Sequence, residues 1–81
     1  METWQIESSP EVDAFLVGNA GLVDELVESL QSLTFTEGLP DIGAMEVEPN
    51  LFYWLTAAYI VVYRRMKATK TVRLISIKPD N

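Results

Sequence analysis

Hydrophobic positions recur with a helical period in one segment of the chain and with a strand-like period in several others. The clearest helical segment places its apolar residues on one face, at Leu22, Val23, Leu26, Val27, Leu30 and Leu33. Acidic and amide side chains occupy the other face of the same segment. This spacing predicts an amphipathic helix whose apolar face is covered by a sheet.

A strand and a first helix are predicted upstream of that segment. Trp4 and Ile6 lie two residues apart, as one face of a short strand requires. Ser9 is a suitable N-cap for a helix that starts at Pro10, where the missing backbone N–H costs nothing. Gly18 is expected to end this first helix.

Three strands are predicted beyond residue 50, because the sequence there is rich in β-branched and aromatic residues. They are LFYWLT (51–56), AYIVVYRR (58–65) and TVRLISIK (71–78). The links between them are short, which favours an antiparallel meander. Residues 34–50 contain two glycines and two prolines and are expected to form a loop, with a short edge strand at 45–48.

The predicted fold class is therefore α+β. It has an N-terminal strand, two helices packed on one sheet face, and an antiparallel three-stranded meander. The chain has 81 residues, of which 48% are hydrophobic and 22% charged. This length and composition indicate one domain spanning residues 1–81.

The composition excludes several kinds of chemistry. The chain contains no cysteine and no histidine, so a Cys/His zinc site, a thiol nucleophile and an imidazole acid or base are all excluded. No glycine-rich phosphate loop occurs, and the paired acids are typical of a solvated surface. We therefore expect neither a cofactor nor a metal ion.

Charge is segregated between the two parts of the chain. Residues 1–50 carry eleven acids and no Lys or Arg, whereas residues 51–81 carry all six bases and a single acid, Asp80. The whole-chain net charge of −6 thus hides a basic meander that also contains five aromatic residues. Such a sheet suits single-stranded RNA, although aromatic residues at strand spacing are more often core.

The C-terminal pattern resembles that of a known family. The run AYIVVYRRMKATKTVRLISIKP resembles the C-terminal half of the RelE/ParE toxin superfamily, in which an apolar-apolar-Tyr triplet (here Val61, Val62 and Tyr63) ends one strand before a short turn. The opening WQIESSPEVDAFL is similar to that family's first strand and helix. The resemblance implies a RelE-like fold and a bacterial, plasmid-stabilisation-like toxin of a type II toxin–antitoxin system.

The resemblance also suggests site residues. RelE-like members cut messenger RNA on the ribosome, and the candidate catalytic residues here are Arg64, Arg73, Lys78 and Asp41. The chain departs from those members at Ile60, where an arginine is usual, and at Tyr53 and Trp54, where basic residues are expected. ParE-like members instead bind DNA gyrase without nuclease chemistry.

The sequence thus favours a toxin-fold protein that acts by protein binding, with an antitoxin and a cellular target such as gyrase as its partners. The expected partner-binding residues are Arg64, Arg65, Lys67, Lys70, Arg73, Trp54 and Tyr53. Two alternatives remain: a ribosome-dependent endoribonuclease that contacts RNA, and a small acidic homo-oligomer such as a homodimer. The N-terminus is acidic, and the longest run without a charged residue has 13 residues, too few to cross a membrane as a helix. The sequence therefore predicts a cytoplasmic protein without a membrane segment.

Overall fold

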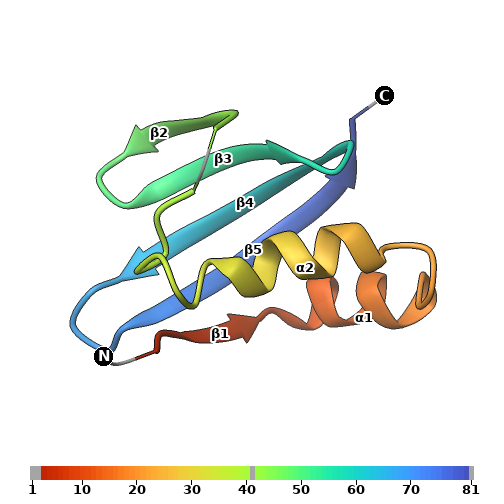
Figure 1. The fold of residues 1–81 in the computed structure, drawn as a ribbon, viewed down its shortest axis with the longest axis horizontal. Coiled ribbons are helices and arrows are strands. Elements are labelled where there is room, and N and C mark those ends of the chain that lie inside the picture. Colours follow the sequence, from red (N-terminus) through yellow and green to blue (C-terminus); the bar gives the residue numbers. More distant parts are fainter. Residues whose placement is uncertain (1–2, 41, 81) are drawn as a thin grey trace.

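The computed structural model describes residues 3–40 and 42–80 and contains two helices and one sheet (Figure 1). The elements follow the chain in the order β1 (Gln5–Ser8), α1 (Pro10–Gly18), α2 (Asp24–Ser32), β2 (Ala44–Glu48), β3 (Leu51–Thr56), β4 (Tyr59–Met66) and β5 (Thr71–Pro79). The broad α+β class predicted from the sequence is confirmed. The antiparallel pairing of the last three strands is confirmed as well.

The sheet differs from the predicted arrangement in strand order. It has five strands in the order β1-β5-β4-β3-β2, and it is mixed because β1 pairs with β5 in parallel. The short strand expected at 45–48 is β2, and it extends the meander at the far edge. The detailed RelE-like arrangement is therefore not confirmed.

The position of β1 has a physical cause that local patterns do not reveal. The helices and the loop after α2 carry the chain from β1 at one edge of the sheet to β2 at the other edge. The meander then returns to β5 beside β1, with Ile6 opposite Val72 and Ser8 opposite Leu74. Figure 1 shows α1 and α2 over the β5 side of the sheet, with β2 at the opposite edge. The first and last strands of the chain are therefore neighbours in the sheet.

Both helices begin and end close to the predicted positions. The Ser9 side chain accepts a hydrogen bond from the Val12 N–H (3.2 Å), as the capping pattern predicts. Asn19 closes α1 by donating from Nδ2 to the Phe15 carbonyl (2.7 Å). The prediction that Leu22 lies on the apolar face of the second helix is wrong, because this residue precedes α2 in a turn and is 79% exposed.

The core lies between the helices and one face of the sheet. Tyr63 is fully buried at its centre, stacks on Phe52 with ring centroids 5.3 Å apart, and meets Trp54 edge-on. Its hydroxyl donates a hydrogen bond to the Gly38 carbonyl (2.8 Å). The core therefore ties the meander to the loop that follows α2.

Gly43 permits the close approach that starts β2. Its φ is +87°, and a Cβ atom there would lie 2.8 Å from the Leu55 carbonyl oxygen. Gly21 has a similar φ of +84° but open space around it. We expect Gly43→Ala to lower the free energy of unfolding by about 2 kcal/mol, and Gly21→Ala by about 1 kcal/mol from backbone strain alone.

Urea denaturation of both variants measures this difference. Gly21→Ala is the matched control, since it imposes the same positive φ on alanine without the contact. Equal losses in the two variants would show that the Leu55 carbonyl moves away at no cost.

Candidate binding sites

The two faces of the sheet have different surroundings. Phe52, Trp54, Val61 and Tyr63 point toward the helices and are buried. The residues between them along the strands point the other way, and no helix among the described residues packs on them. We call this surface the helix-free face; its side chains include Leu51, Tyr53, Leu55, Ile60, Val62, Arg64, Arg73 and Lys78.

The helix-free face is apolar near β2 and β3. Met45 is 66% exposed, and Tyr53 and Leu55 are each 48% exposed. With Ile60 they line a shallow hollow of about 350 Å³ that Gly43, Ala44 and Asp80 complete. A small domain that leaves adjacent large apolar side chains in water offers a surface suited to a partner.

The edge strand β2 borders this hollow. It pairs with β3 on one side only, and all its residues except Ala44 are exposed. Its register shifts between Glu46 and Glu48, and the Glu46 carboxylate accepts a hydrogen bond from the Asn50 N–H (2.7 Å). Two carboxylates on a short, irregular edge disfavour pairing between two copies of the strand.

The basic residues of the helix-free face are partly neutralised. Arg73 Nη2 lies 2.6 Å from Glu7 Oε1, and Arg64 Nη2 lies 3.8 Å from Glu48 Oε2. Arg64 and Arg73 are direct cross-strand neighbours. Lys78 is instead the cross-strand neighbour of Ile60, which precedes Arg64 by four residues on β4. At strand spacing, Lys78 therefore lies about 13 Å from Arg64 along the sheet.

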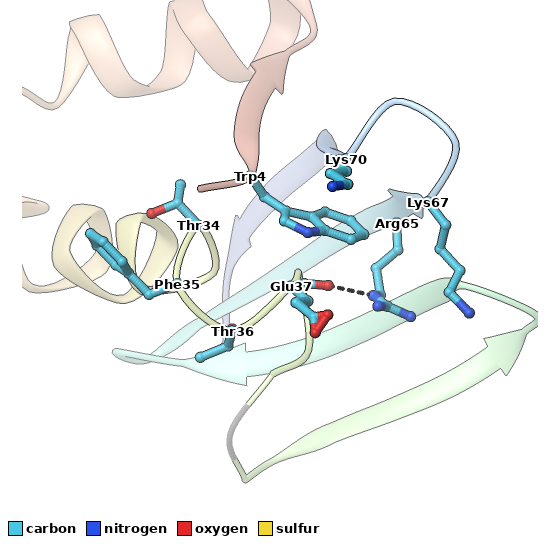
Figure 2. A pocket seen from close by; sticks show the side chains of 8 residues that line it. All are labelled: Trp4, Thr34, Phe35, Thr36, Glu37, Arg65, Lys67 and Lys70. Carbon is cyan, nitrogen blue, oxygen red and sulfur yellow. Dashed lines mark hydrogen bonds between the residues drawn. The ribbon is translucent and has the colours of Figure 1, made fainter. Parts of the chain in front are cut away.

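Three other cations lie near the turn between β4 and β5, around a separate hollow of about 490 Å³ (Figure 2). Arg65 points to the helix side, and Lys67 and Lys70 come from the turn between β4 and β5. We call this hollow the basic pocket; it is also lined by Trp4, Thr34, Phe35, Thr36 and Glu37.

The structure thus divides the predicted partner-binding residues among three environments. Tyr53, Arg64 and Arg73 share the helix-free face, whereas Arg65, Lys67 and Lys70 surround the basic pocket. Trp54 lies in the core, 4% exposed, where its indole N–H donates to the Ile42 carbonyl (3.1 Å). Asp41, a candidate general base, lies outside the described residues.

Sequence reasoning did not single out the apolar hollow. Its signal was present in LFYWLT, since a strand that is apolar at successive positions has apolar side chains on both faces. The single layer of helices covers one face of the sheet, so the apolar side chains on the other face stay exposed to solvent. Trp4 and Phe35 of the basic pocket were missed because they lie far in sequence from the cations they join.

The candidate catalytic cations are not gathered in one cluster. Arg64 and Arg73 each contact a glutamate, and Lys78 stands apart from both.

Burial raises the pKa of the Tyr63 phenol above its ordinary value; Arg65 opposes this shift and Glu46 adds to it. That hydroxyl is therefore held neutral within the core.

Comparison with known proteins leaves the family open. No model of a known protein family matches the sequence, and a search of curated proteins finds no significant match. Within residues 3–40 and 42–80, no helix is long and apolar enough to cross a membrane.

Proposed function

We propose that the protein acts by binding another protein through the helix-free face of its sheet. The observation that carries this proposal is the apolar hollow at Met45, Tyr53, Leu55 and Ile60, on the face that the helices leave uncovered. Burying these side chains is favourable by about 25 cal/mol for each Å² of apolar surface removed from water. The sheet therefore has one face for its own core and one for a partner.

The neighbouring edge strand suggests how the partner binds. An extended segment that pairs with β2 gains main-chain hydrogen bonds, and an apolar side chain of that segment then reaches the hollow. Glu46 and Glu48 on β2 favour a basic segment over a second copy of the same acidic strand. Charge complementarity thus points to a different protein as the partner rather than to a homodimer.

The resemblance to RelE/ParE toxins gives the proposal its most specific form. In that form, the partner is an antitoxin encoded next to this chain, and the free protein inhibits a cellular target such as gyrase. The pairing of Arg64 and Arg73 with glutamates, and the distance of Lys78 from both, make a ribonuclease the less favoured candidate.

Isothermal titration with the antitoxin proposed to be encoded next to this chain tests the binding surface. We expect a complex whose affinity falls at least about tenfold with Leu55→Asp, because a carboxylate in the hollow would be desolvated on binding. Leu22→Asp is the matched control, since it makes the same change at an exposed residue in the turn before α2. Circular dichroism establishes that both variants fold.

Growth after induced expression tests the toxin form separately. We expect growth arrest that is relieved by co-expression of the proposed antitoxin. Unimpaired growth would contradict a toxin. Equal affinities of Leu22→Asp and Leu55→Asp, or a wild-type homodimer that Leu55→Asp dissociates, would contradict binding of a partner protein at the hollow.

A further inference from the structure

Two cations of the basic pocket, Arg65 and Lys67, lie close together in sequence at the end of β4. Figure 2 shows both side chains extending the same way from this end of the strand, with the Trp4 ring beside Arg65. The pocket opens on the helix side of the sheet, whereas the surface proposed to bind protein lies on the other side. It is therefore a separate candidate site.

Arg65 is fixed in this pocket by neutral groups. Its Nε donates to the Glu37 carbonyl (2.7 Å), and its Nη1 donates to the Asn50 Oδ1 (3.2 Å). Its guanidinium carbon lies 5.1 Å from the centre of the Trp4 ring. These contacts orient the guanidinium without cancelling its charge.

Part of this guanidinium has no acceptor in the protein. Within residues 3–40 and 42–80, Nη2 of Arg65 donates no hydrogen bond, and neither Arg65 nor Lys67 forms an ion pair. Arg65 is half-buried, and a charge that has lost part of its hydration without gaining a counter-ion is costly. An anion bound here would lower that cost.

The donors favour a phosphate group over other anions. An arginine presents N–H groups in a rigid fork that matches two phosphate oxygens, and a lysine adds charge without demanding a fixed geometry. A phosphate monoester carries a charge of about −1.5 to −2 at neutral pH, so it is attracted to two cations more strongly than a carboxylate with one charge. The hollow, of about 490 Å³, falls within the range of small-molecule sites.

We propose that the basic pocket binds the phosphate group of a small molecule between Arg65 and Lys67. The guanidinium, already oriented by Glu37 and Asn50, donates to the phosphate oxygens from Nη2. The net charge of −6 opposes the approach of a long polyanion, whereas a small phosphate compound carries few charges.

Titration with inorganic phosphate at constant ionic strength, followed by the backbone amide NMR signals, tests this site. We expect saturable shifts at Glu37, Arg65 and Lys67, with a dissociation constant below about 5 mM. Acetate is expected to bind at least about fivefold more weakly, because it carries one charge. A parallel titration with glycerol 3-phosphate distinguishes the two sources of the group. Equal affinities assign the site to free phosphate, and tighter binding of the ester assigns it to a phosphorylated organic molecule.

Three variants test the role of charge in the pocket. Asn50→Asp places a carboxylate beside Nη1 of Arg65 and cancels its charge without removing the side chain, so we expect about tenfold weaker phosphate binding. Lys67→Gln is expected to weaken binding about fivefold. Glu37→Gln is expected to strengthen it about threefold, because it removes the one carboxylate among the described lining residues. Circular dichroism establishes that each variant folds.

Lys78→Gln is the matched control, since it changes the net charge as Lys67→Gln and Asn50→Asp do but on the other face of the sheet. Equal weakening by Lys67→Gln and Lys78→Gln would overturn the site in favour of bulk attraction. Absence of saturation at about 20 mM phosphate, or acetate binding as tightly as phosphate, would overturn the proposal. So would a single-stranded RNA that binds the pocket far more tightly than either phosphate compound. None of these results bears on the protein-binding surface.

Discussion

Replacing Tyr63 with alanine is expected to lower the free energy of unfolding by about 4 kcal/mol, near the upper end of what one truncated core side chain costs. The ring is fully buried, stacked on Phe52 and in edge contact with Trp54, so its removal leaves a cavity bounded by two large aromatic residues. For a domain of this size, such a loss lowers the melting temperature by roughly 20 °C. Thermal and urea denaturation measure it directly.

Two further variants separate the parts of this effect. Tyr63→Phe keeps the ring but leaves the Gly38 carbonyl without its donor, which is expected to cost about 1–2 kcal/mol. Tyr53→Ala removes the same side chain from the half-exposed helix-free face, where a loss below about 1 kcal/mol is expected. A similar loss for Tyr53→Ala and Tyr63→Ala would mean that the core is not centred on Tyr63.

Raising the pH above about 10 is expected to destabilise the protein steeply. Burial raises the pKa of Tyr63 in the folded state, so the unfolded chain releases the phenolic proton first as the pH increases. The contribution of the neutral phenol is fully present below about pH 10 and is lost above it, by about 1.4 kcal/mol for each pH unit. Over about two pH units the loss reaches about 2.7 kcal/mol.

Urea denaturation between about pH 9 and 12 tests this linkage. Tyr63→Phe has no phenol to ionise, so its stability is expected to depend much less on pH in this range, whereas Tyr53→Phe retains the wild-type slope. The same slope in wild type and Tyr63→Phe would assign the alkaline loss to other groups.

Local sequence patterns predicted the elements well because each rests on neighbouring residues. The Ser9–Pro10 cap and the strands after residue 50 depend on contacts a few positions apart, and the structure places them close to the predicted bounds. The parallel pairing of β1 with β5 depends on residues 66 positions apart, as between Glu7 and Arg73. No local period specifies such a pairing.

The candidate sites were predicted only in part, because they too combine residues close in sequence with residues far apart. The sequence grouped all six bases together because they lie within 15 residues of one another. Strand alternation then sends Arg64 and Arg65 to opposite faces, so neighbours in sequence belong to different surfaces. The basic pocket needs Trp4 and the Glu37 carbonyl beside Arg65, and only the folded chain brings them together.

The pairing of the first strand with the last has a consequence during synthesis on the ribosome. The hairpin of β3 and β4 forms from adjacent residues, whereas β1 is made before the other described strands and has no strand partner until β5 has been made. Until then, Ile6 lacks its β5 neighbour Val72. Trp4 directly precedes β1, so a truncated chain that lacks β5 loses the strand pairing that holds Trp4 against Arg65 on the wall of the basic pocket.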